Sequence, residues 1–219
     1  MIDAVVFDMD GVIVDSEQVW DDVREQYTRE VGGTYTESAT RDMMGMSSLE
    51  WSRYMHDALG VPGTPEEINA EVVRRMLERY GETPPLIPGA VEAVRACAER
   101  WALAVASSSN PELIEVVLER AGIRALFRGV VSSQEVPRGK PAPDVYLEAA
   151  RRLGAEPARC AAVEDSHNGI RSAKAAGMRV VAVPNTHFPP DAESLALADA
   201  VVQSVGEVPD TIRGLNDVE

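Results

Sequence analysis

Short, almost wholly apolar runs recur along this chain of 219 residues and alternate with helical patterns. Because the runs are rich in Val and Ala and mostly lack alternating polar residues, they are typical of strands buried on both faces of a parallel sheet. They cover residues 2–7, 101–106, 129–132, 160–164, 178–183 and 200–202. The alternation predicts an α/β fold, a Rossmann-like parallel sheet flanked by helices with right-handed connections.

The helices expected between these strands begin and end at recognisable signals. They cover residues 88–97, 143–153 and 167–176, and a further helix opens at the N-cap and first-turn proline of Asn110–Pro111. Gly122, Gly154 and Gly177 stand where helix C-termini belong. A last helix is expected after Val205, over the sheet edge.

Residues 17–80 break the alternation, because this stretch shows helical periodicity and no strand pattern. Helices are predicted over 17–31, 49–59 and 65–80, separated by segments rich in Gly and Pro. We expect a small helical-bundle cap domain, residues 16–85, inserted after the first strand of a catalytic core domain made of residues 1–15 and 86–219. Since both connections to the insert lie side by side, the cap has the layout of a hinged lid over the strand ends.

The net charge limits the possible partners, and the cysteine spacing indicates the state of the thiols. The net charge is −15, from 36 acidic and 21 basic residues, which argues against nucleic acid and anionic membranes as partners. Cys97 and Cys160 have no metal or redox spacing and are expected to be reduced and partly buried. No signal peptide and no run of membrane-spanning length is recognised, so a cytoplasmic location is predicted. A monomer that binds a small phosphorylated metabolite is also expected.

Two aspartates at the end of the first strand have side chains that are expected to point to the same side. Residues two apart in a strand point the same way, so Asp8 and Asp10 are expected to face one site. Such a pair can divide the work of nucleophile and general acid and can share a hard cation. Gly11 allows a sharp turn that brings backbone amides close to a bound anion.

Polar residues also follow the other strands, and ligands of open α/β sheets bind beyond the carboxyl ends of strands. The groups are Ser107, Ser108 and Asn110 after the second strand, Lys140 after the third, and Glu164 and Asp165 after the fourth. Four carboxylates at one edge would repel one another unless a cation neutralised them, and an oxygen-only ligand set suits Mg²⁺. These are the parts needed for phosphoryl transfer to water.

The residues suggest a division of roles in that reaction. Asp8 would attack phosphorus, while Asp10 would protonate the leaving oxygen and then activate water. Ser107 would donate a hydrogen bond to a phosphoryl oxygen, and Lys140 would neutralise charge on the transferred group. Each piece also has an ordinary structural explanation, such as a helix cap for the serines, a solvated loop for the lysine and a helix dipole for the acid pair. Their order at four successive strand ends favours a site.

Four segments together resemble the haloacid dehalogenase-like superfamily over essentially the whole chain: residues 8–16, 107–110, 140–144 and 164–169. The cap resembles that of the sugar-phosphatase and β-phosphoglucomutase branch. The resemblance implies that Mg²⁺ is bound by the Asp8 carboxylate, the Asp10 carbonyl and Asp165, with Glu164 supporting the metal. It also implies that the aspartate at position 10 protonates an alkoxide leaving group.

The cap residues direct the choice of substrate. Trp20 resembles its counterpart in hexitol and 2-deoxyglucose-6-phosphate phosphatases; its indole suits a sugar ring, although helix packing explains it equally well. Gly45 joins Gly11, Ser108 and Asn110 in the predicted substrate-binding set. The cationic cap residues of β-phosphoglucomutases are missing at Trp20, near Ser48 and near Met76. Arg24 and Arg53 are expected to be solvated, although either could guide an anion.

These observations predict a Mg²⁺-dependent phosphomonoester hydrolase that acts on a small phosphorylated sugar or polyol through an aspartyl-phosphate. Three alternatives stay open. One is a phosphomutase of the β-phosphoglucomutase type, and another is a broad-specificity phosphatase of a different small metabolite such as phosphoglycolate. The third is a binding or regulatory protein with an inactive site.

Overall fold

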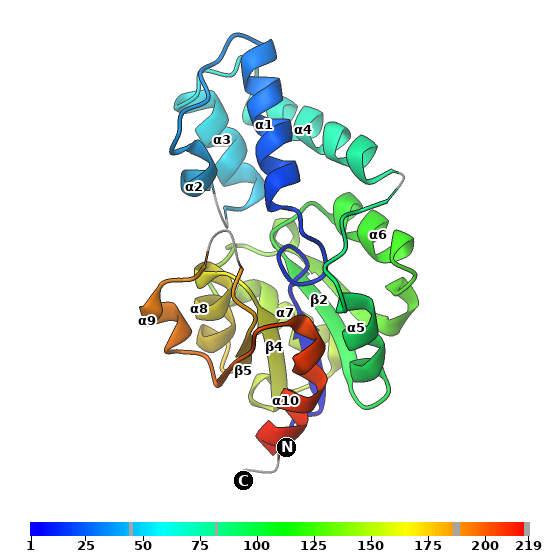
Figure 1. The fold of residues 1–219 in the computed structure, drawn as a ribbon. Helices are drawn as coiled ribbons and strands as arrows, with labels where there is room; N and C mark the ends of the chain where they lie inside the picture. Colours follow the sequence, from blue (N-terminus) through cyan, green and yellow to red (C-terminus); the bar gives the residue numbers. More distant parts are fainter. Residues whose placement is uncertain (44–45, 82, 186–188, 217–219) are drawn as a thin grey trace.

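The computed structural model describes residues 1–43, 46–81, 83–185 and 189–216, and Figure 1 shows a helical cap above an α/β core. Along the chain, the helices and strands are β1 (Ala4–Phe7), α1 (Glu17–Glu30), α2 (Ala39–Met43), α3 (Ser48–Asp57), α4 (Pro65–Tyr80), α5 (Ala90–Ala98), β2 (Ala102–Ser107), α6 (Pro111–Arg120), β3 (Phe127–Ser132), α7 (Asp144–Leu153), β4 (Cys160–Glu164), α8 (His167–Ala175), β5 (Arg179–Ala182), α9 (Ala192–Leu195), β6 (Ala200–Val201) and α10 (Val208–Asn216).

Within the described ranges, six strands form one all-parallel sheet in the order β3-β2-β1-β4-β5-β6. This confirms the predicted fold class. The central strand β1 lies between β2 and β4, and Val5, Val6 and Phe7 are wholly buried. Successive side chains of β1 point to opposite faces, so Val5 and Phe7 join one apolar cluster and Val6 joins another.

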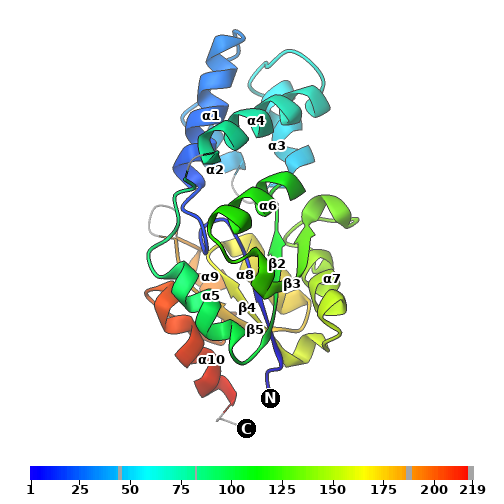
Figure 2. The same ribbon diagram turned by 90° about the vertical axis from the view of Figure 1, so that its right-hand side faces the viewer.

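Helices cover both faces of the sheet, as Figure 2 shows from the side. The cluster that contains Phe7 includes Val94 of α5, Leu113 of α6 and Ile212 of α10. The cluster on the opposite face includes Tyr146 of α7 and Ile170 of α8. Burial on both faces explains why the strand sequences are continuous apolar runs.

Most predicted elements are present, with ends shifted by one or two residues. Strand β3 begins at Phe127, two residues before the predicted start. The prediction missed these residues because exposed Arg128 interrupts the apolar run. Helix α2 was missed because five residues are too few to show a helical period. The stops at Gly122, Gly154 and Gly177 are confirmed, since all three have positive φ.

The helices α1 to α4 follow β1 and form the cap. Trp51, Met55, Ile68 and Met76 are buried within it. The two connections to the core lie side by side as predicted, because the residue 14–15 segment pairs with the residue 85–86 segment through an isolated bridge and a 2.7 Å backbone hydrogen bond. The proposed boundaries, residues 1–15 and 86–219 for the core and 16–85 for the cap, stay a prediction.

Cys97 and Cys160 are free and fully buried, rather than partly buried. None of the helices in the described ranges combines the length and apolar character needed to cross a bilayer. The cytoplasmic location and the monomeric state stay predictions.

Two glycines give a matched test of the local backbone. Gly177 ends α8 with φ +82°, Gly214 lies inside α10, and a Cβ at either position would meet no atom within 4 Å. Gly177→Ala should destabilise the fold by about 1 kcal/mol, because an L residue is strained in the left-handed region. Gly214→Ala should be neutral or stabilise it by up to about 1 kcal/mol through helix propensity. Urea unfolding measures both, and equal shifts of the two midpoints would contradict this assignment.

Candidate active site

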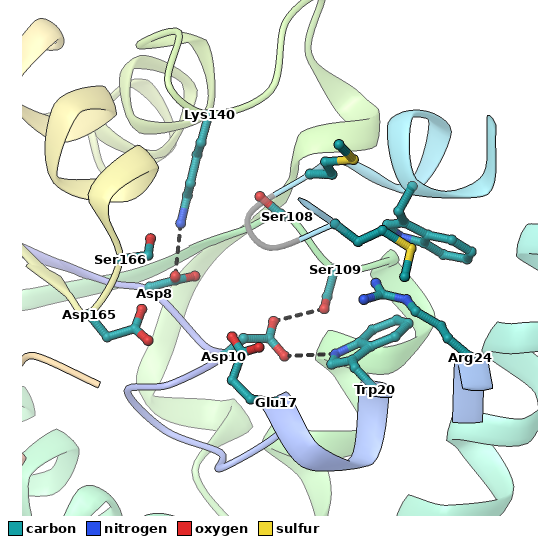
Figure 3. A pocket seen from close by; sticks show the side chains of 13 residues that line it. Asp8, Asp10, Glu17, Trp20, Arg24, Ser108, Ser109, Lys140, Asp165 and Ser166 are labelled. Atoms are coloured by element: carbon teal, nitrogen blue, oxygen red, sulfur yellow. Dashed lines mark hydrogen bonds and ion pairs between the residues drawn. The ribbon is translucent and has the colours of Figure 1, made fainter. Parts of the chain in front are cut away.

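Four strand ends meet at one pocket beneath the cap. Its volume is about 70 Å³, and Figure 3 shows core residues on one side and cap residues on the other. The core contributes Asp8, Asp10, Ser108, Ser109, Lys140, Asp165 and Ser166, and the cap contributes Glu17, Trp20, Arg24, Met43, Met46 and Trp51. The register of the parallel strands brings the core groups together, since Phe7 of β1 lies beside Val163 of β4.

Lys140 forms two buried ion pairs. Its Nζ lies 3.0 Å from Oδ2 of Asp8 and 2.7 Å from Oε1 of Glu164. Burial alone would lower the pKa of Lys140 and raise that of Glu164. The ion pairs outweigh burial, so the pKa of the ammonium lies above its usual value and that of Glu164 below its usual value. The ion pairs therefore keep Lys140 and Glu164 charged.

Glu164 is held from several directions. Tyr146 of α7 donates its hydroxyl to Oε1 over 2.7 Å, and the backbone N–H groups of Asp165 and Ser166 donate to Oε2 over 3.0 and 3.2 Å. The first turn of α8 passes so close that a Cβ at Gly169 would lie 1.7 Å from Glu164 Oε1. A glycine at 169 is therefore needed for the carboxylate to sit against the helix.

The position of the Asp165 carboxylate depends on a second glycine, Gly11. Gly11 has φ +76°, and a Cβ there would lie 1.8 Å from Oδ2 of Asp165. Asn185 also donates to that oxygen over 3.3 Å. The turn after β1 thus brings the backbone against a carboxylate that follows β4.

Three acids form a possible metal site. Ligand atoms of Asp8, Glu164 and Asp165 lie within 4.8 Å of one another, and all three residues are buried. Burial and the charges of neighbouring carboxylates raise the pKa of Asp8 and of Asp165 well above the ordinary value, although Lys140 opposes this at Asp8. One ammonium does not balance three carboxylates, and an all-oxygen donor set suits a hard cation. The donor set therefore fits a divalent metal.

Asp10 accepts four hydrogen bonds. Oδ1 receives Ser16 Oγ at 2.6 Å and Trp20 Nε1 at 3.3 Å, and Oδ2 receives Ser107 Oγ at 3.2 Å and Ser109 Oγ at 2.8 Å. All four partners are donors, so they fix the carboxylate next to the nucleophile candidate Asp8. Trp20 both holds Asp10 and packs on Trp51, with ring centroids 5.9 Å apart.

The predicted site residues occupy three kinds of position. Six line the pocket: Asp8, Asp10, Trp20, Ser108, Lys140 and Asp165. Ser107, Glu164 and Gly11 support those residues from behind. Asn110 contacts the cap instead, because its Oδ1 accepts from Ser48 Oγ at 2.8 Å and its Nδ2 donates to Asn69 at 3.3 Å. Gly45 lies outside the described residues, and the catalytic roles stay predictions.

Several contributors were missed from the sequence. Ser109 could have been found as the third serine of its run, and Ser166 as the residue after the acid pair. Glu17 and Arg24 lie three residues before and four after Trp20, a spacing that places them on one face of α1. The expectation that Arg24 is solvated is wrong, since its Nε is buried beside the pocket. No spacing signal pointed to Tyr146.

The comparisons with known proteins agree with this geometry. A family model described as haloacid dehalogenase-like hydrolase matches residues 2–177. Hexitol phosphatase B of Escherichia coli (strain K12) is 34% identical over 209 residues, which cover 94% of this chain and 93% of that protein. Fructose-1-phosphate phosphatase YqaB of the same organism is 34% identical over 188 residues, which cover 82% of this chain and 95% of that protein.

A solved structure shows the same fold. The crystal structure of CbbY from Rhodobacter sphaeroides in complex with phosphate superposes with a TM-score of 0.83 at 26% identity, covering 95% of this chain and 96% of that one. The chain therefore belongs to the haloacid dehalogenase-like hydrolases, in their sugar-phosphatase and β-phosphoglucomutase-like branch. It is a phosphatase of that family, a phosphoric monoester hydrolase.

The stability of the fold depends on pH through Glu17, a carboxyl of the pocket lining. Burial, and then the charge of Asp10, raise the pKa of Glu17 from 4.5 to about 7, while Arg24 opposes them. Between those values the folded chain binds more protons at this carboxyl than the unfolded chain does. Its contribution to stability is therefore present at low pH and is lost as the pH rises through about 7.

Replacing this carboxyl by an amide should remove that pH dependence. Glu17→Gln and the wild type should differ little in melting temperature at about pH 5, and the variant should melt higher at about pH 8. Thermal unfolding across this range measures the difference, with exposed Glu37→Gln as the matched control. A difference that does not grow with pH would refute the assignment.

Proposed function

We propose that this protein is a Mg²⁺-dependent phosphomonoester hydrolase that acts on a small phosphorylated sugar or polyol through an aspartyl-phosphate. The observation that carries the proposal is the buried cluster of Asp8, Glu164 and Asp165, in which Asp8 and Glu164 pair with the Lys140 ammonium. The phosphatase relatives support the reaction class, since their names specify hexitol phosphates and fructose 1-phosphate.

Mg²⁺ fits the donor set of the cluster. The carboxylates of Asp8 and Asp165 and the backbone carbonyl of Asp10 would hold it, with Glu164 behind them. When bound, the ion supplies positive charge that draws a phosphate group to the site and offsets its negative oxygens. Lys140 adds a second positive charge beside Asp8.

The first step transfers the phosphoryl group to the protein. An oxygen of Asp8 forms a bond to phosphorus as the bond between phosphorus and the substrate oxygen breaks. Asp10, in its protonated form, gives its proton to that leaving oxygen, which departs as an alcohol. Ser16, Trp20, Ser107 and Ser109 fix the position of the acid through their hydrogen bonds.

The second step returns the protein to its starting state. A water molecule attacks phosphorus and loses its proton to the Asp10 carboxylate, while the bond between phosphorus and Asp8 breaks. Inorganic phosphate leaves, and the Asp8 carboxylate and the protonated Asp10 are restored. The cap limits the access of bulk water, and the hydrogen bonds of Asn110 to Ser48 and Asn69 help to hold it against the core.

The cap favours hydrolysis of a sugar or polyol phosphate. The indoles of Trp20 and Trp51 offer apolar surface of the kind that packs against a carbon chain or ring. Two of the positions where β-phosphoglucomutases carry cations in the cap hold uncharged residues here: Met76, which is wholly buried, and Ser48, which is bonded to Asn110. Arg24 is a cation of the cap lining at a different position. The two uncharged positions support hydrolysis over the phosphomutase alternative.

The reaction is tested by substituting the nucleophile. Asp8→Asn should reduce phosphate release from hexose and polyol phosphates by at least about 10³-fold, because an amide oxygen is a poor nucleophile. The wild type should lose release when Mg²⁺ is chelated. The matched control is Asp22→Asn, the same change at an exposed position on α1, which should retain wild-type turnover.

Release of phosphate from a panel of sugar, polyol and nucleotide phosphates and phosphoglycolate measures these effects. Release from phosphoglycolate or nucleotides alone would retain the mechanism and overturn the proposed substrate class. Conversion of β-glucose 1-phosphate to glucose 6-phosphate without release would favour the mutase. A folded wild type that turns over nothing would favour the binding-protein alternative.

A further inference from the structure

Arg24 is placed in the pocket by α1 and by two aromatic rings. Its guanidinium carbon lies 4.6 Å from the ring centroid of Trp20 and 4.8 Å from that of Trp51. Figure 3 shows the guanidinium over Trp20, directed toward Ser109 across the pocket. Contacts of a cation with two ring faces restrict where this long side chain can go. The charge is therefore held at a fixed place on the cap side.

This guanidinium has no partner among the residues that the structure describes. Its Nε is buried without a hydrogen bond, and no carboxylate of the described ranges lies within 4.0 Å of its nitrogens. Of the nearby acids, Asp10 accepts four hydrogen bonds and Asp21 accepts from Tyr35 and Thr40. Glu17 acts on the guanidinium through its charge alone. Of the five N–H donors of the guanidinium, the one on Nε is buried without a partner, which is unfavourable.

Among the described residues that line the pocket, Lys140 and Arg24 are the cations, and they differ in whether an ion pair engages them. Lys140 is already balanced by Asp8 and Glu164 at the reaction centre. Arg24 lies on the side opposite the nucleophile and forms no ion pair with a described carboxylate, so the charges of Glu17, Asp10 and Asp21 act on it only from beyond 4.0 Å. A planar guanidinium matches the two oxygens of a carboxylate or phosphate.

We propose that Arg24 is a specificity-determining residue that binds a second anionic group of the substrate, at the end remote from the phosphate that is removed. Within the proposed class, the preferred substrate then carries a second anionic group, as a phosphorylated sugar acid or a sugar bisphosphate does. This inference rests on the proposed function, because it requires that the phosphate ester is hydrolysed at Asp8. It adds a requirement on the far end of the substrate.

Compounds that differ only in the far group test the inference. The pairs are glucitol 6-phosphate with 6-phosphogluconate, erythritol 4-phosphate with erythronate 4-phosphate, and fructose 6-phosphate with fructose 1,6-bisphosphate. The wild type should show a kcat/KM about ten- to hundredfold higher for the anionic member of at least one pair. The sugar acids report on a carboxylate and the bisphosphate on a phosphate.

Variants separate recognition from structure. Arg24→Gln should abolish the preference by lowering kcat/KM about ten- to hundredfold more for the anionic member of a pair than for its partner, since it removes a contact made only by the second anion. Arg24→Lys should retain part of the preference because the charge remains. Arg29→Gln, an exposed arginine on the same helix, is the matched control and should retain all of it.

The possible outcomes distinguish a failure of this inference from a failure of the proposed function. Hydrolysis of the neutral compounds with no preference for any anionic partner overturns the role of Arg24 and leaves the proposed function intact. An equal loss for both members of a pair in Arg24→Gln also overturns it, because the residue would then act through packing alone. Release of phosphate from none of the compounds overturns the proposed function and this inference together.

Discussion

The site depends on one buried ammonium group. Lys140 lies between Asp8 and Glu164, which come from the adjacent strands β1 and β4, and it reaches them from the loop after β3. Removing the lysine would leave buried carboxylates without their counter-charge, which is more unfavourable than losing an exposed ion pair. Tyr146 completes the arrangement by donating to Glu164 from α7. One ion-pair network thus connects the strand ends, the loop and a covering helix.

The core and the cap contribute different residues to the pocket. The core holds the carboxylates and the lysine, and its parallel strands place them with little freedom. The cap contributes one face of α1, from which Glu17, Trp20 and Arg24 reach the pocket. Trp20 also donates to Asp10, so the position of the cap is coupled to the position of the acid–base residue. In the proposed mechanism, substrate selection and proton transfer would be linked through this indole.

The fold and the core of the site could be predicted from the sequence because both follow from regular patterns of apolar residues along the chain. Continuous apolar runs gave the strands, and the carboxyl ends of parallel strands must lie at one edge. Contacts between distant segments leave no such pattern. Nothing near Gly169 shows that Glu164 will press against it, and nothing near Arg24 shows that Trp51 will cover its guanidinium. These features arise from packing between helices and strands that the chain brings together only on folding.

The acids at the strand ends repel one another until a cation joins them. Thermal unfolding with and without Mg²⁺ tests this repulsion most directly. In the absence of metal, Asp165→Asn should melt at a higher temperature than the wild type, because it relieves repulsion with Asp8 and Glu164. Added Mg²⁺ should raise the melting temperature of the wild type by several degrees and leave that of the variant unchanged. Equal responses of the two proteins to Mg²⁺ would contradict the account.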